Sequence, residues 1–167
     1  MKINVSRLRK EAGSIEEFQF IIPQLQDMNG VLINKPISVR GRLSNIGEAL
    51  QLIAQVETGL SVRCDRCLEE VLVPLEFEFI ENYCHESDSD EETIENNEYI
   101  VFEDDLIDMV QAVRENIILN LPMRVLCAPD CPGICSQCGQ NLKEKKCNCS
   151  SDTVDPRLAV LAKLKQL

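Results

Sequence analysis

Nine cysteines constrain this chain more than any other feature of its sequence. Eight of them form the close pairs Cys64/Cys67, Cys127/Cys131, Cys135/Cys138 and Cys147/Cys149, and Cys84 stands alone. An odd number of cysteines at short spacings is not the pattern of a disulfide framework. Such pairs are typical of metal sites, and four pairs supply enough thiolates for two four-cysteine sites.

The spacing within each pair has a geometric reason. Zinc binds four ligands tetrahedrally with Zn–S distances of about 2.3 Å, so two thiolates must converge from one tight turn. Gly139 directly follows Cys138 and can adopt the positive φ that such a turn often needs. The sequence therefore predicts one structural zinc ion held by the four cysteines between residues 135 and 149.

A second zinc site would join Cys64/Cys67 to Cys127/Cys131 across about sixty residues. The free energy of zinc binding would outweigh the slowly growing entropy cost of closing this loop. Two alternatives fit the same residues. The four thiols could lie close together without an ion, or Cys131 could join the C-terminal cysteines. Cys84 is expected to be a small buried thiol at the end of a strand.

Composition narrows the class of protein. The chain is 44% apolar but only 4% aromatic, so its core must consist of Leu, Ile and Val. Residues 1–7 contain no apolar segment of a signal peptide, and no apolar run approaches the ~20 residues of a membrane helix. We expect a soluble cytoplasmic protein. The single histidine, His85, lies beside an acidic run and is expected to be a solvated loop residue, so we expect no catalytic activity.

Periodicity predicts an α+β fold. Residues 37–44 and 50–54 alternate as two strands joined by a turn at 45–47, a second turn is expected at 57–59, and residues 71–80 form a further strand of this small antiparallel β-meander. An apolar stripe from Leu106 to Leu121 predicts one long amphipathic helix packed on it, capped by Asp104 and Asp105. A cysteine-rich zinc-binding C-terminal segment and a terminal helix opened by Asp155-Pro156 would follow. This places an α+β body at residues 1–126 and a zinc ribbon with the C-terminal helix at 127–167.

Residues 86–98 hold seven acids and almost nothing to bury, so we expect a disordered acidic loop. Without these seven acids the net charge changes from −11 to −4, so the rest of the chain can carry local basic patches. The candidate nucleic-acid contacts are Arg40, Arg42, Arg63, Arg66, Lys143, Lys145 and Lys146. The lysines have an alternative role, because cations beside a four-thiolate zinc site offset its charge.

An ordered set of motifs over residues 35–167 resembles the YceD family, the large ribosomal RNA subunit accumulation proteins, formerly a domain of unknown function. The motifs are Arg63-Cys64-Asp65-Arg66-Cys67-Leu68, the acidic insertion, Asn120-Leu121-Pro122, Leu126-Cys127 through Cys149, and Asp155-Pro156-Arg157-Leu158. The resemblance implies a bacterial or plastid cytosolic protein needed for 23S ribosomal RNA to accumulate, often encoded next to a large-subunit ribosomal protein.

The resemblance also implies that the family's metal knuckles correspond to Cys64, Cys67, Cys127 and Cys131. The ribbon at residues 135–149 matches longer members of the family and is absent from shorter ones, which suggests a stabilising or partner-specific extension.

Three functions follow from these observations. The first is a non-catalytic zinc-binding factor in large-subunit biogenesis that binds precursor ribosomal RNA or a large-subunit ribosomal protein, with no membrane and no small-molecule substrate. The second is a metal-dependent ribonuclease in ribosomal RNA processing, which would need carboxylates in a defined cleft. The third is a zinc store or redox sensor. We favour the first.

Overall fold

The computed structural model of the chain describes residues 1–25, 32–87 and 99–149. Its elements are β1 (Lys2–Asn4), the 3-10 helix η1 (Leu8–Lys10), β2 (Ile15–Ile22), β3 (Leu32–Ile33), β4 (Ile37–Asn45), β5 (Leu50–Arg63), β6 (Glu70–His85), β7 (Ile100–Phe102), β8 (Leu106–Asp108) and α2 (Met109–Leu119). The described part of the chain contains no helix that is long and apolar enough to cross a bilayer.

The chain divides into two compact units. The first comprises Met1–Val62 and Val71–Met123, and the second comprises Arg63–Glu70 and Arg124–Leu167. The turn between β5 and β6 therefore groups with the C-terminal cysteines, whereas the division made from the sequence placed it in the body.

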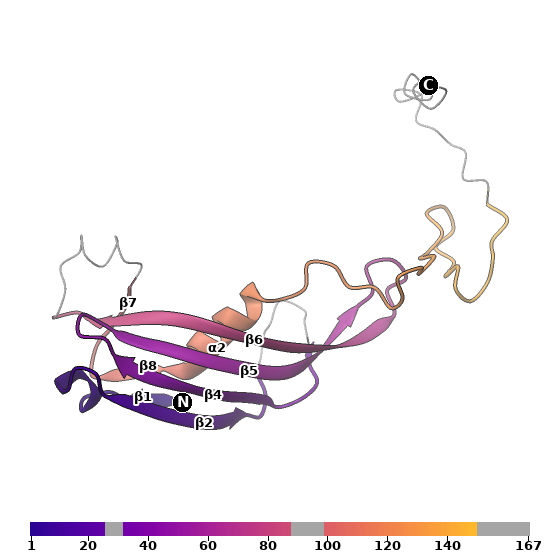
Figure 1. Cartoon of the computed structure of the whole chain (residues 1–167). Coiled ribbons are helices and arrows are strands. Elements are labelled where there is room, and N and C mark those ends of the chain that lie inside the picture. Colours follow the sequence, from indigo (N-terminus) through magenta and orange to yellow (C-terminus); the bar gives the residue numbers. More distant parts are fainter. Residues whose placement is uncertain (26–31, 88–98, 150–167) are drawn as a thin grey trace, which may run out of the picture. The chain divides into compact units, whose positions relative to one another are not determined.

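A six-stranded sheet dominates the first unit (Figure 1). Five of its strands follow the order β2-β4-β5-β6-β7, and the sixth, β3, pairs with β5 outside this order. The alternation seen in the sequence places Ile37, Val39 and Leu43 in the core, while Arg40 and Arg42 are exposed. The pairs β2–β4 and β4–β5 are antiparallel, and the second is the pairing expected of the meander. Strand β5 runs unbroken through residues 57–59, so the turn expected there is wrong. Strand β7 runs parallel to β6, so the sheet is mixed rather than purely antiparallel.

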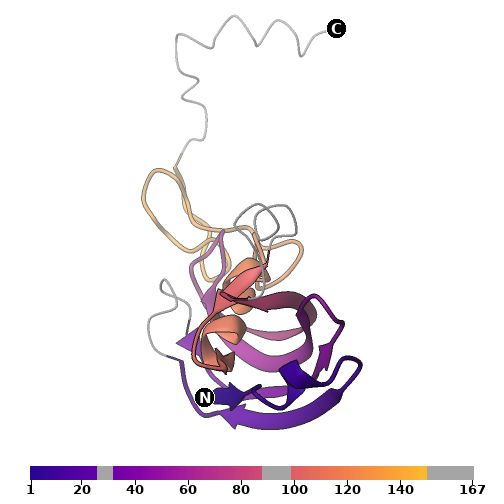
Figure 2. The same ribbon diagram turned by 90° about the vertical axis from the view of Figure 1, so that its left-hand side faces the viewer.

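The core of the first unit is mainly Leu, Ile and Val, as expected, but Phe79, Tyr83, Phe102 and Met109 also belong to it. Buried residues of β4, β5 and α2 belong to one hydrophobic cluster, and Figure 2 shows α2 lying inside the curve of the sheet. Cys84 is buried one residue before the end of β6, which confirms the expectation for this thiol.

The long amphipathic helix expected between Leu106 and Leu121 is wrong, because α2 has only 11 residues. Residues Leu106–Asp108 form β8 instead, which pairs antiparallel with β1. Asp108 caps the helix by accepting a hydrogen bond from the Val110 amide at 3.0 Å. The position of Leu106 fits the apolar period of the helix, but its backbone belongs to strand β8. The terminal helix expected from Asp155 and residues 88–98 of the acidic loop lie outside the described residues.

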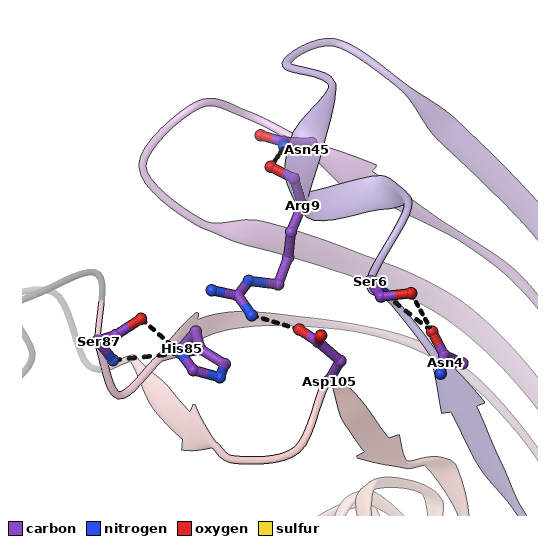
Figure 3. A network of polar contacts seen from close by, with 7 residues as sticks. All are labelled: Asn4, Ser6, Arg9, Asn45, His85, Ser87 and Asp105. Carbon is purple, nitrogen blue, oxygen red and sulfur yellow. Dashed lines mark hydrogen bonds and ion pairs between the residues drawn. The ribbon is translucent and has the colours of Figure 1, made fainter.

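Polar contacts fix the N-terminal segment to the rest of the first unit (Figure 3). Arg9 of η1 forms an ion pair with Asp105, which lies in the turn between β7 and β8. The buried Asn45 side chain donates to the carbonyls of Leu8 and Arg9 at 2.8 and 3.1 Å and accepts from the Gly47 amide at 2.8 Å. Because each polar atom has a partner, the buried amide is compatible with the core.

His85 also differs from the prediction of a solvated loop residue. It ends β6, is half-buried, and packs edge-on against Phe102 with ring centroids 5.4 Å apart. Its Nδ1 shares a 2.8 Å hydrogen bond with Ser87 (Figure 3). The acidic run therefore begins directly after the end of β6. The composition around His85 did not indicate that this residue belongs to a strand.

Gly41 offers a test of the sheet packing. A Cβ added there would collide with the Ile53 carbonyl oxygen and lie 2.8 Å from Phe18 Cζ. We expect Gly41→Ala to lower the free energy of unfolding by about 2–3 kcal/mol, because the neighbouring strand must shift. Ser38→Ala, on the same strand, should change it by less than about 0.5 kcal/mol. Denaturant unfolding measures both, and equal effects would contradict the close approach.

Candidate metal centres

The first cysteine pair lies in the turn that connects β5 to β6. The Cys64 amide donates to the Glu69 carbonyl at 2.8 Å, and the Leu68 amide donates to the Cys64 carbonyl at 2.9 Å. Leu68 has φ of 64°, in the left-handed region that non-glycine residues rarely adopt. These bonds close a tight knuckle that presents Cys64 and Cys67 to the same point.

The four sulfurs of Cys64, Cys67, Cys127 and Cys131 lie within 4.8 Å of one another. The Sγ atoms of Cys64 and Cys131 are 3.9 Å apart, and those of Cys67 and Cys127 are 3.5 Å apart. Tetrahedral Zn–S bonds of about 2.3 Å require sulfur–sulfur distances of about 3.8 Å. The cluster therefore has the dimensions of a four-thiolate metal site, and the structure places Cys131 in it rather than with the C-terminal cysteines.

The C-terminal cysteines form a second cluster, Cys135, Cys138, Cys147 and Cys149, whose sulfurs also lie within 4.8 Å of one another. Its knuckle repeats the bonds of the first: the Cys135 amide donates to the Gln140 carbonyl at 2.8 Å, and the Gly139 amide donates to the Cys135 carbonyl at 2.9 Å. Gly139 has φ of 71°, as its position after Cys138 suggested. The two turns thus share one backbone design.

The clusters differ in exposure. In the first, Cys64, Cys67 and Cys131 are buried and Cys127 is half-buried. In the second, Cys138 and Cys149 are exposed. A metal ion in the second cluster would therefore be more accessible to chelators and oxidants than an ion in the first.

The electrostatics of each cluster favour a cation. Burial raises the pKa of Cys64, but backbone amides of Cys67, Arg66 and Cys127 outweigh it and lower the pKa to about 6. Backbone hydrogen bonds, that of Cys138 first, lower the pKa of Cys135 to about 6. One thiol in each cluster therefore ionises near neutral pH.

The remaining thiols resist ionisation. The backbone amide of Glu69 lowers the pKa of Cys67, but burial and the neighbouring thiols outweigh it and raise the pKa to about 12. The hydrogen bond with Cys138 and then burial raise the pKa of Cys149 to about 12. Further negative charge in either cluster is unfavourable unless a cation compensates for it, so metal binding would displace protons.

Contacts outside the thiols hold the first cluster together, and sequence reasoning missed them. The Asp65 carboxylate accepts from the Val125 amide at 2.6 Å, and the Asp65 amide donates to the Val125 carbonyl at 2.8 Å. Arg66 donates to the Cys131 carbonyl at 2.8 Å. The one available signal was an Asp inside a C-x2-C turn, where its side chain readily accepts a backbone hydrogen bond.

The predicted nucleic-acid contacts fall in both units. Arg40 and Arg42 are exposed on β4, and Arg40 bonds Gln55 and Glu57, both at 2.9 Å. In the second unit, Lys143 lies 2.6 Å from Glu69, which raises the pKa of Lys143 and lowers that of Glu69. Arg63, Lys145 and Lys146 are exposed.

The two clusters should respond differently to loss of a ligand. Cys64 lies in the turn between the two longest strands, so Cys64→Ser should increase hydrogen exchange across residues 37–80. Cys138→Ser should loosen the C-terminal ribbon and leave those residues protected. Hydrogen-exchange mass spectrometry on both variants and the unaltered chain measures this. Equal deprotection of residues 37–80 by both substitutions would contradict the separation.

Comparison with known proteins follows the same cysteine-bearing segments. The family model described as "Large ribosomal RNA subunit accumulation protein YceD" matches residues 52–165, which include all eight clustered cysteines. No solved structure matches the chain.

Several curated proteins are similar to this chain. An uncharacterized protein of Mycobacterium tuberculosis is 26% identical over 168 residues, covering 98% of this chain and 81% of that protein. The uncharacterized protein YlbN of Bacillus subtilis is 29% identical over 130 residues, covering 77% of this chain and 74% of that protein. The chloroplastic large ribosomal RNA subunit accumulation protein YCED homolog 1 of Arabidopsis thaliana is 30% identical over 60 residues, covering 36% of this chain and 19% of that protein. Because the family model spans more than half of its residues, the chain belongs to the YceD family of large ribosomal RNA subunit accumulation proteins.

Proposed function

We propose that this chain is a non-catalytic zinc-binding factor that supports 23S ribosomal RNA accumulation and large-subunit biogenesis by binding precursor ribosomal RNA or a large-subunit ribosomal protein. The observation that carries the proposal is the pair of four-cysteine clusters, each with its sulfurs within 4.8 Å of one another, inside the segment that matches the family. The family's printed description supplies the link to large-subunit RNA.

The donor set supports a structural role for the metal. Each cluster offers four thiolates, so an ion would have no open position for a water or substrate, as catalytic zinc requires. Zinc fits four sulfurs at this spacing, and its binding would fold the second unit around two knuckles. The exposed Cys138 and Cys149 favour one alternative, a zinc store or redox sensor at the second cluster.

Metal content tests the first part of the proposal. We expect two zinc ions per chain by elemental analysis of the purified protein, and one ion after either Cys64→Ser or Cys138→Ser. A chelator should remove the ion of the second cluster first, because two of its ligands are exposed. One zinc or fewer in the unaltered chain, or iron with visible absorption, would contradict the assignment.

Local charge supports contact with a ribosomal precursor. Arg63, Lys145 and Lys146 are exposed beside the cysteine turns, where they can neutralise phosphates despite the negative total charge. The chain has five Phe, two Tyr and no Trp, so base stacking on aromatic side chains is not its main means of contact.

Sedimentation tests the second part. We expect the tagged full-length chain to migrate with large-subunit precursors on a gradient. Lys145→Gln combined with Lys146→Gln should weaken this association. Lys10→Gln combined with Lys35→Gln removes the same charge from the first unit and serves as the control. Absence from precursor fractions, together with cleavage of naked RNA, would contradict the proposal in favour of a ribonuclease.

A further inference from the structure

A groove in the first unit is not used by the metal clusters. It is a cavity of about 430 Å³ bounded by β7, β8 and α2. Its wall includes Ile100, Val101 and Leu106, whose side chains are 40%, 43% and 38% exposed. The buried Phe102 and Ile107 also line it. The volume lies within the range of binding pockets, and the lining offers apolar contact.

Strand β7 explains why this apolar wall is open. It ends the order of the six-stranded sheet, with β6 on one side and no strand on the other among the described residues. Ile100 and Val101 therefore remain accessible at a sheet edge, where an extended segment of another chain can lie alongside them.

The charges around the groove are mainly negative. The acidic lining residues are Glu103, Asp104, Asp108 and Glu115. Lys2 is the basic side chain in the lining, and the Met1 amino group lies 3.7 Å from Asp108. Four carboxylates thus line the groove against Lys2 and the Met1 amino group. The Arg9 guanidinium, which is paired with Asp105, lies 5.9 Å from the ring centroid of the lining residue Phe102.

Tyr83 forms a buried part of the groove wall. Burial raises the pKa of Tyr83, and the hydrogen bond to Glu81 raises it further. The charges of Glu115 and Asp108 act in the same direction. Glu81 is held in place by Tyr83 and by the Asn116 amide of α2. Asp108 and Glu115 therefore place negative charge near the Tyr83 wall of the groove, where a cationic group would meet it.

We infer that this groove binds a Lys or Arg side chain from an extended basic segment of a protein partner. The aliphatic stem of such a side chain would lie on Ile100, Val101 and Leu106, and its charged head would meet the carboxylates. Proteins that bind RNA carry basic segments of this kind to neutralise phosphates. The inference rests on the proposed function and assigns this surface to a protein partner, because the carboxylates would repel RNA.

The test uses the full-length zinc-loaded chain and a short fluorescent peptide that alternates Arg or Lys with Val and Leu. Its twin carries Gln at every basic position. Fluorescence anisotropy gives the two affinities, and a single-stranded uridine oligonucleotide is the RNA probe. We expect the basic peptide to bind at least about tenfold more tightly than its twin. Any binding of the oligonucleotide should not depend on the groove residues.

Matched substitutions separate the groove from overall charge. Glu103→Gln with Asp104→Asn removes two carboxylates from the groove, and Asn tolerates the φ of 53° at residue 104. Glu76→Gln with Glu78→Gln removes two exposed carboxylates of β6, neither of which lines the groove. The groove variant should weaken peptide binding by about tenfold, and the control by less than about twofold. Glu115→Gln is a second groove variant, for use if the first unfolds.

Three results would overturn the inference: equal weakening by both pairs of substitutions, equal binding of the basic peptide and its twin, or oligonucleotide binding that the groove variant weakens. If the unaltered chain still migrates with large-subunit precursors, these results remove the groove assignment alone. If the unaltered chain does not migrate with large-subunit precursors, the proposed function itself is contradicted.

Discussion

The convergence of two distant segments on one sulfur cluster is the constraint on which the second unit depends. Cys67 and Cys127 are separated by 60 residues, yet their Sγ atoms lie 3.5 Å apart. The paired hydrogen bonds between Asp65 and Val125 hold the two segments at this point, and Arg66 adds a bond to Cys131. Closing so long a loop costs entropy that grows only slowly with length, so a few bonds and one metal ion can offset it.

Sequence reasoning reached the cysteine clusters because each close pair marks half of a metal site, and four pairs supply two sites. The short spacing of each pair sets a knuckle, and Gly139 marks the left-handed residue that closes one of them. The equivalent residue in the other knuckle is Leu68, which carries no such signal. Asp65 was also missed, because its role depends on Val125, which is remote in the sequence. Local geometry and the grouping of the cysteine pairs were predictable, and the hydrogen bonds between the distant segments were not.

The same distinction explains the fold. The alternation in β4 and β5 predicts strands, because successive side chains point to opposite faces of a sheet, and the short turn between them predicts the antiparallel pairing. Leu106 shares the apolar period of α2, but pairing of β8 with β1 takes it into a strand. The parallel addition of β7 likewise depends on β6 rather than on the composition of Ile100–Phe102. The total charge likewise does not reveal where charges gather. The acidic groove residues lie in the first unit, and the exposed basic residues beside the cysteines lie in the second.

The Glu69–Lys143 ion pair joins the two cysteine clusters. Glu69 closes the first knuckle, and Lys143 lies in the loop between Cys138 and Cys147, with Asn141 bonding the same carboxylate at 3.2 Å. Any ordering of that loop by one ion favours the other site, and thermodynamic linkage makes the effect reciprocal. Exposed ion pairs contribute little, so this positive cooperativity would be a few-fold at most. The two ions would then titrate as nearly independent sites, each with its own affinity.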